Sequence, residues 1–165
     1  MLKKFTVLFT AVVLAVFFIS CSSDDSDNAS TGAAINKNAG SMYLPEEFAS
    51  KKISASYAGR YSFNQPYLGL KYQDYGVCAL YLFSDGTWVN SVCGDFSWMG
   101  SGSVKQPCWK GTWTQKSGDL TSGVVVLTQT HNWCGNEWKP QTDIYTLDIS
   151  NGKFQMSNVE FTKKN

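Results

Sequence analysis

The chain has 165 residues, a formal net charge of +1, 16% charged residues and 15% aromatic residues. Removing a leader that contains Lys3 and Lys4 would leave 12 basic against 13 acidic residues, which is not the basic excess that nucleic-acid-binding proteins usually carry. Few charges and many aromatic rings predict a large apolar core, an adhesive surface, or both. We therefore expect one folded domain and no nucleic-acid partner.

Residues 1–20 have the pattern of a secretory signal peptide. Lys3 and Lys4 precede an apolar stretch over residues 5–19, which is shorter than the ~20 residues that a membrane-spanning helix needs. An uncleaved membrane anchor is the alternative. The stretch ends in Phe18-Ile19-Ser20-Cys21, which resembles the lipobox of bacterial lipoproteins. The resemblance implies lipidation of Cys21, whose acyl chains (palmitate-like) would bind the protein to a membrane.

Residues 21–41 are expected to be the lipidated cysteine and a disordered tether, and residues 42–165 the folded domain. The tether is small and polar, so it cannot bury enough apolar surface to become ordered. Its acidic start, Ser22-Ser23-Asp24-Asp25-Ser26-Asp27, resembles the surface-export signal of lipoproteins in the Bacteroidota, and a solubilising tether is the alternative. The expected location is the outer membrane, facing the cell surface or the periplasm.

One short N-terminal helix is predicted at the start of the domain. Pro45 suits the first helical position, the acidic pair 46–47 suits the positive end of the helix, and the basic pair 51–52 suits the negative end. Phe48 and Ile53 would form its buried side.

Everything after this helix reads as β-strands, because the segments are rich in Val, Ile, Thr and aromatic residues and are separated by turn residues. They predict an all-β fold, an antiparallel up-and-down barrel of eight to nine strands. The predicted strands are Tyr57–Phe63, Val77–Phe83, Thr87–Cys93, Trp109–Lys116, Gly123–Thr130, Asp143–Ile149, Lys153–Ser157 and Val159–Lys163, with Tyr67–Tyr72 as a possible ninth.

The turns predict that the two ends of the barrel differ. Short turns at 84–86, 117–119 and 150–152 all fall at one end of an up-and-down meander, and two of them carry the Asp-Gly or Asn-Gly pairs that favour tight hairpins. The longer connections, at 64–76, 94–108 and 131–142, fall at the opposite end. One closed end and one open end are typical of a cup-shaped barrel.

Four cysteines besides Cys21 lie at the predicted open end: Cys78, Cys93, Cys108 and Cys134. An even number in an exported chain favours disulfides. Symmetry about the intervening hairpin turns favours the pairs 78–93 and 108–134. The alternative pairs are 93–108 and 78–134.

The open end is also rich in aromatic residues. Aromatic rings on loops are frequent in recognition surfaces, although these rings could instead fold inward and cap the core. The candidate ligand-binding residues are Phe96, Trp98, Trp109, His131, Trp133 and Trp138.

Catalysis and metal binding are not expected. His131 is the only histidine, so a Ser-His-Asp or Cys-His mechanism would depend on it, and no G-x-S-x-G motif is present. The spacing of His131 and Cys134 suits zinc, but disulfides are the better use of these thiols outside the inner membrane. We therefore expect no enzyme activity, no catalytic residue and no cofactor.

Short motifs along the strands resemble those of the lipocalin-like small lipoproteins of bacteria. They are Gly59-Arg60-Tyr61, Phe83-Ser84-Asp85-Gly86-Thr87-Trp88, Gly111-Thr112-Trp113, Gly123-Val124-Val125-Val126-Leu127 and Tyr145-Thr146-Leu147-Asp148-Ile149. The resemblance covers about residues 57–157 and implies a lipocalin-like barrel with a binding site at its open mouth. Tyr61 stands where true lipocalins have a tryptophan that closes the barrel floor.

Two functions follow as hypotheses. The first is a lipid-anchored cell-envelope protein whose barrel mouth binds a small apolar or amphipathic ligand, which predicts a lined interior cavity. The second is an inhibitor-like or adhesin-like module that binds a protein or a glycan through its aromatic loops, which predicts a filled core and exposed Trp98, Trp133 and Trp138.

Overall fold

The computed structural model describes residues 40–65, 70–96 and 102–165. The predicted lipidation site Cys21, the predicted leader and almost all of the tether lie outside these residues, as does the candidate ligand-binding residue Trp98. Within the described part of the chain, no helix has the length and apolarity needed to cross a membrane.

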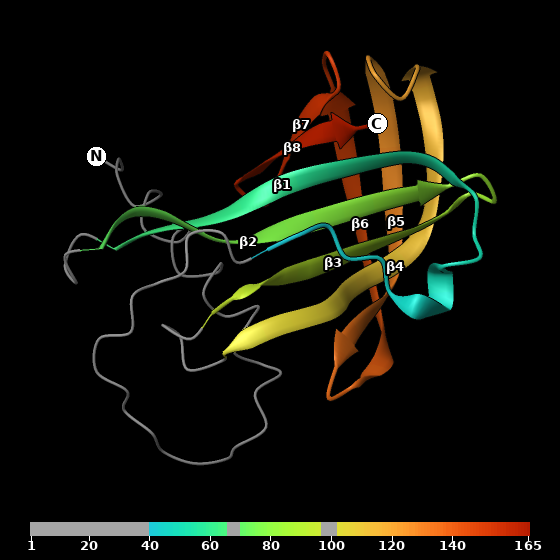
Figure 1. The fold of residues 1–165 in the computed structure, drawn as a ribbon. Coiled ribbons are helices and arrows are strands. Elements are labelled where there is room, and N and C mark those ends of the chain that lie inside the picture. Colours follow the sequence, from blue (N-terminus) through green and yellow to red (C-terminus); the bar gives the residue numbers. More distant parts are fainter. Residues whose placement is uncertain (1–39, 66–69, 97–101) are drawn as a thin grey trace, which may run out of the picture.

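The described chain is almost entirely β-structure (Figure 1). A single short 3₁₀ helix precedes the strands. The elements are η1 (Glu46–Phe48), β1 (Ile53–Gln65), β2 (Leu70–Phe83), β3 (Thr87–Asp95), β4 (Ser103–Gly118), β5 (Gly123–Cys134), β6 (Glu137–Ile149), β7 (Lys153–Met156) and β8 (Val159–Lys164).

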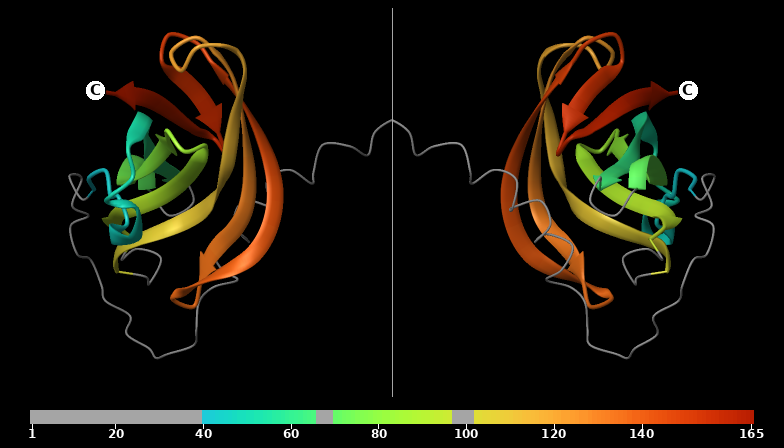
Figure 2. Two further views of the ribbon diagram at one scale, coloured as in Figure 1. Left: turned by 90° about the vertical axis from the view of Figure 1, so that its right-hand side faces the viewer. Right: turned by 90° about the vertical axis from the view of Figure 1, so that its left-hand side faces the viewer.

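The strands form one antiparallel eight-stranded sheet in the order β6-β5-β4-β3-β2-β1-β8-β7. The first six strands follow one another as a meander, and the β7–β8 hairpin then returns to place β8 beside β1. The sheet curls into a half-barrel, as the end-on views in Figure 2 show. The prediction of an all-β, antiparallel fold with eight to nine strands is therefore confirmed, since the described residues form eight strands, and the arrangement observed is a half-barrel.

The two edges of this sheet are β6 and β7. They follow each other in the chain and approach at the turn over residues 150–152, where an isolated bridge joins Ser150 to Lys153. β7 has only four residues and β6 has thirteen, so much of the edge of β6 that faces away from β5 has no strand beside it within the described part of the chain. We call this interval between β6 and the β7–β8 hairpin the seam.

The main core fills the concave face of the sheet. Alternate residues along each strand point to one face, and the fully buried side chains of this main core include Trp88, Tyr57, Leu80, Leu82 and Leu127. The Tyr57 hydroxyl donates to the carbonyl of Leu120, at the end of the half-barrel near the β4–β5 turn.

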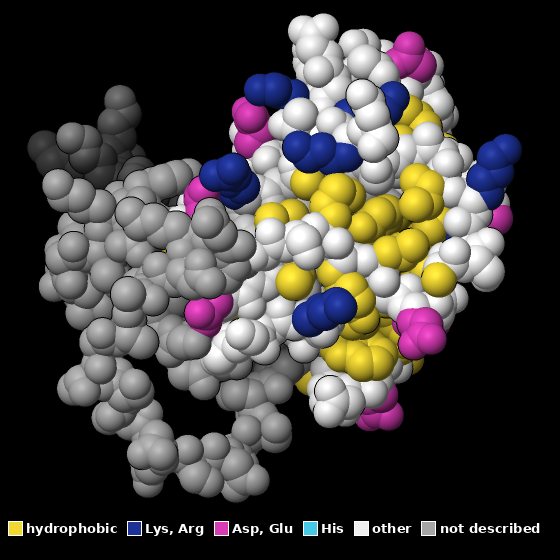
Figure 3. All heavy atoms as spheres, viewed as in Figure 1, with side chains coloured by type: hydrophobic (Ala, Val, Ile, Leu, Met, Phe, Trp, Pro, Cys, Tyr) yellow, Lys and Arg dark blue, Asp and Glu magenta, His cyan; other side chains and the backbone are white. Residues whose placement is uncertain are grey.

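A second apolar cluster covers the convex face of β2 and β3. Phe48 stacks on Phe83 at 5.6 Å, and Met42 and Leu44 pack against the same cluster. The segment from residue 40 to η1 therefore lies across this face, and hydrophobic side chains gather in the middle of the view in Figure 3.

The predicted N-terminal helix is a single 3₁₀ turn. Pro45 precedes it as the N-cap, and Phe48 is buried as expected. Ile53, predicted to lie on the buried side of the helix, instead begins β1 and is 42% exposed. The basic pair 51–52 lies beyond the turn.

The predicted long connection at 131–142 does not exist as a loop. β5 and β6 continue through it and pair up to Cys134 and Glu137, so only Gly135 and Asn136 form the turn. Both have positive φ, 62° and 61°, which is the conformation of a tight type I′ hairpin. Trp133 and Trp138 are therefore cross-strand partners on this hairpin.

The predicted disulfides are absent. Cys78, Cys93 and Cys108 are free thiols, so neither 78–93 with 108–134 nor 93–108 with 78–134 is formed. The β2–β3 connection spans three residues rather than two, so Cys78 pairs with Val92 and Cys93 pairs with Val77. A shift of one residue reverses the faces, so the thiols of Cys78 and Cys93 lie on opposite sides of the sheet.

Candidate functional site

A cavity of about 200 Å³ lies on the concave side of the half-barrel. Its walls come from strands β1 to β4, from β6 and from the β7–β8 hairpin, which are far apart in the sequence. The lining residues are Tyr61, Cys78, Asn90, Trp109, Gln141, Asp143, Tyr145, Met156, Ser157, Val159 and Phe161.

The mouth of the cavity is at the seam. Asp143 and Ser157 are the exposed lining residues, and they come from the two sides of the seam, β6 and the β7–β8 turn. Gln141, next to Asp143 along the same strand face, is half-buried. Polar groups therefore surround the entrance.

The depth of the cavity is mainly aromatic. The rings of Trp109 and Tyr145 lie 6.4 Å apart and are tilted by 32°, and the ring of Phe161 forms part of the wall from β8. Tyr61 lies 5.5 Å from the ring of Phe96, which is buried at the end of β3. Asn90, the deepest polar residue, donates a 3.0 Å hydrogen bond to the carbonyl of Ala79.

One glycine allows the β7–β8 hairpin to close over this space. Gly59 on β1 pairs with Phe161 on β8. A Cβ at residue 59 would overlap Cγ1 of Val159 and come within 2.9 Å of the Glu160 carbonyl oxygen. The close approach of β8, and with it the cavity wall at Val159 and Phe161, therefore requires glycine at this position.

A small polar network lies at the β6 side of the cavity. The Tyr145 hydroxyl donates a 3.0 Å hydrogen bond to Oε1 of Gln129, which is fully buried. Burial, together with the neighbouring Asp143 carboxylate, raises the pKa of Tyr145 to about 12. Tyr145 therefore remains a neutral hydrogen-bond donor at any physiological pH.

The buried thiols are poor nucleophiles. Burial raises the pKa of Cys78, which lines the cavity, to about 12. Burial, and secondarily the nearby Cys78, also raises the pKa of Cys108, the extra residue at a bulge in β4. Since the thiolate is the nucleophile, neither cysteine is activated for covalent catalysis.

The structure divides the predicted ligand-binding residues between two faces. Phe96 and Trp109 lie on the concave side, and only Trp109 lines the cavity itself. His131, Trp133 and Trp138 lie on the convex side, because β5 is shifted in register near residue 130 and its alternation reverses there. The structure therefore does not unite these residues in one site.

Trp133 and Trp138 belong instead to a shallow groove of about 460 Å³ beside η1, with Tyr43 on its other side. The two indole rings meet edge to face at 5.2 Å. The indole N–H of Trp138 donates a 2.7 Å hydrogen bond to Oε1 of Glu47. The ammonium of Lys110 lies 4.2 Å from the centroid of the same indole ring. These contacts fix Trp138 against the N-terminal segment.

Asp143 and Gln141 are site residues that sequence reasoning missed. The sequence signal that could have identified Asp143 was the alternation along residues 143–149, which places Asp143, Tyr145 and Leu147 on one face of the strand. His131, by contrast, lies outside the cavity. Among the described residues, its side chain forms one hydrogen bond, between Nδ1 and the hydroxyl of its neighbour Thr130 at 3.0 Å.

Within the described residues, no group of three or more His, Cys, Asp and Glu side chains is placed to hold a metal ion. No protein-family model, curated protein or solved structure matches the chain. The geometry of the cavity and its mouth is therefore the basis for assigning a function.

Proposed function

We propose that this protein is a lipid-anchored binding protein of the cell envelope, with a lipocalin-like barrel whose interior holds a small apolar or amphipathic ligand. The cavity of about 200 Å³, apolar in its depth and polar at its mouth, is the observation that carries this proposal. A folded core normally leaves few voids, so a lined cavity with an entrance favours a binding role. The proposal assigns the protein no catalytic role.

The size of the cavity limits the ligand. An apolar cavity of roughly 150 Å³ is large enough to bind benzene, whereas pockets for drug-sized molecules hold roughly 300–1,000 Å³. A cavity of about 200 Å³ therefore suits a single ring with a short substituent. A long acyl chain would not fit inside it.

Filling the cavity tests this proposal. Met156 is buried in the cavity wall, so Met156→Trp should occupy the space and abolish binding of single-ring compounds detected by ligand-observed NMR. Gln141→Trp, at the half-buried mouth, should obstruct entry with less strain on the core. Ile144→Trp is the matched control, because Ile144 is 65% exposed outside the cavity and should leave binding unchanged. If Met156→Trp and Gln141→Trp bind these compounds as well as Ile144→Trp and the wild type do, the proposal is overturned.

The lipid anchor has its own support and its own test. The lipobox-like run that ends at Cys21 follows a short apolar leader, and the polar residues 22–41 supply a tether between the membrane and the domain. An outer-membrane lipoprotein should incorporate an alkyne-tagged palmitate analogue. Cys21→Ala should remove the label, and labelling that persists in this variant would overturn the assignment.

A second candidate function is supported by the convex groove. Tyr43, Trp133 and Trp138 line it together with Glu46 and Asn136. Aromatic faces beside carboxylate and amide groups suit a glycan, since a sugar has apolar ring faces and polar edges. Trp133→Ala should then weaken binding in a glycan array and leave the interior cavity unaffected.

A further inference from the structure

We propose that the interior cavity selects a primary ammonium ion attached to an aromatic ring, with the ammonium at the seam and the ring in the depth of the cavity. This inference rests on the proposed function, because it names the chemical class of ligand for the same cavity.

The charge of the lining is the first reason. Among the described residues that line the cavity, Asp143 is the one acidic residue, and none is a lysine, an arginine or a histidine. Among the described residues, no basic side chain lies within ion-pair distance of Asp143, and the nearby Lys139 is paired with Glu137 at 3.4 Å. A carboxylate without a counter-ion, at the mouth of a largely apolar cavity, attracts a cation and repels an anion.

The arrangement of acceptors is the second reason. The three polar residues at the mouth, Asp143, Gln141 and Ser157, each carry a side-chain oxygen that can accept a hydrogen bond. Oδ1 of Asp143 accepts the Ile144 N–H at 2.8 Å, but an ionised carboxylate has about four acceptor sites and keeps capacity for a ligand. A primary ammonium carries three N–H donors, which matches these three acceptor groups in number.

The walls are the third reason. Behind the polar mouth lie the rings of Tyr61, Trp109, Tyr145 and Phe161. Aromatic rings pack well against another ring in offset or edge-to-face geometry, and the face of a tryptophan also attracts a nearby cation. A ring on a short chain therefore reaches these walls while its ammonium remains at Asp143.

The same ammonium could come from a lysine side chain of a partner protein, on an aliphatic stem. The four aromatic walls favour a ring over an aliphatic stem, and the small volume of about 200 Å³ favours a free small molecule. Butylammonium reproduces a lysine side chain and 2-phenylethylammonium reproduces the ring-bearing amine, so the two separate these sources.

The experiment is calorimetric titration of the purified full chain with four probes: 2-phenylethylammonium, its neutral isostere 2-phenylethanol, the anion phenylacetate, and butylammonium. We expect 2-phenylethylammonium to bind on the order of tenfold more tightly than 2-phenylethanol, since a hydrogen bond to a charged group is the stronger kind. Phenylacetate should bind least.

Asp143→Asn provides the residue-level test. The variant keeps the size of the side chain and removes its charge, so the advantage of 2-phenylethylammonium over 2-phenylethanol should disappear while the affinity for 2-phenylethanol is unchanged. Asp148→Asn is the matched control, because Asp148 is an exposed carboxylate on the same strand outside the lining and should leave all affinities unchanged. Thermal melts of both variants check that they fold.

The outcomes separate the two proposals. Equal binding of the amine and the alcohol, preference for phenylacetate, or an advantage that survives Asp143→Asn would overturn the ammonium assignment while leaving the cavity as a binding site. If butylammonium binds more tightly than 2-phenylethylammonium, the preference for an aromatic ring is overturned. Absence of binding by all four probes would overturn both the ammonium assignment and the proposed function.

Discussion

The hydroxyl of Tyr145 donates a 3.0 Å hydrogen bond to Oε1 of Gln129, while Nε2 of the same buried side chain has no hydrogen-bond partner within the described residues. A buried amide with one half unsatisfied is destabilising, because its donor has lost water without replacement. The Tyr145 bond is thus the interaction that holds the Gln129 side chain in the core of the half-barrel.

Removing this bond should destabilise the fold in a way that depends on Gln129. Tyr145→Phe leaves both polar ends of the Gln129 amide unpaired, so we expect a loss of about 1–2 kcal/mol of unfolding free energy. Gln129→Met removes both buried polar atoms at similar size, and the double variant should be less destabilised than the sum of the single variants. Urea denaturation of all four proteins measures the coupling, and strict additivity would contradict the account.

Closure of the β7–β8 hairpin should depend on Gly59. Gly59→Ala forces a Cβ into Val159 and the Glu160 carbonyl, so we expect about 1–3 kcal/mol of destabilisation and faster amide exchange in β8. Ala58→Ser is the control, because Ala58 points to the other face of β1 and lines a convex groove. Unchanged exchange in β8 of Gly59→Ala would contradict the close packing.

The strands of this fold were predictable because their alternation and composition are local properties of the chain. The length of a turn is harder to predict. The Asp85-Gly86 turn was located correctly, but one additional residue in it reversed the face of Cys93 relative to Cys78. The Gly135-Asn136 turn lies within a polar, aromatic stretch that reads as a loop, so the β5–β6 hairpin was missed.

The site was less predictable than the fold for a different reason. Trp109 was identified because it is aromatic and near a predicted connection. Asp143 and Gln141 gain their significance from Ser157 and Val159 across the seam. The β7–β8 hairpin approaches the concave side only because β8 pairs with β1, a non-local contact with no signal in either segment alone.

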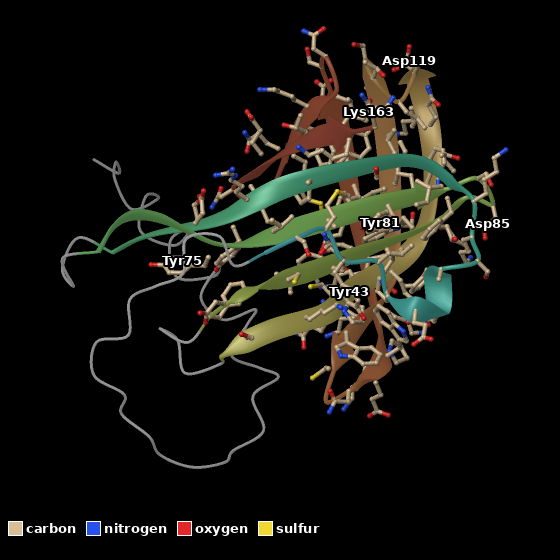
Figure 4. The ribbon with its side chains drawn as sticks, viewed as in Figure 1. Tyr43, Tyr75, Tyr81, Asp85, Asp119 and Lys163 are labelled. Carbon is tan, nitrogen blue, oxygen red and sulfur yellow. The ribbon has the colours of Figure 1, made fainter. Side chains whose placement is uncertain are left out.

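Acid should weaken the β2–β3 turn through Asp85, which lies at the end of that hairpin (Figure 4). Hydrogen bonds from Lys51, and then from Thr87, lower the pKa of this carboxyl from 3.8 to about 2. A folded-state pKa below the unfolded value means that the contribution to stability is present above about pH 4 and is lost as the pH falls toward 2.

The effect of Asp85 should be small, because the ion pair is largely exposed. We expect Asp85→Asn to be less stable than the wild type by under about 1 kcal/mol at pH 7 and equal to it near pH 2. Urea denaturation of both proteins between these pH values measures the difference, with Asp148→Asn as a control for loss of a carboxylate. A difference that grows toward pH 2 would have the wrong sign for this ion pair.

The thiols of Cys78 and Cys108 should be unreactive in the folded protein and reactive once it unfolds. Burial raises the pKa of both thiols, so little thiolate exists at pH 8. Iodoacetamide should therefore leave both cysteines unmodified in the native chain and alkylate both in urea without any reductant, as read by peptide mass spectrometry. If the unreduced, unfolded chain resists alkylation at these two residues until a reductant is added, they are disulfide-bonded and the free thiols assigned here are wrong.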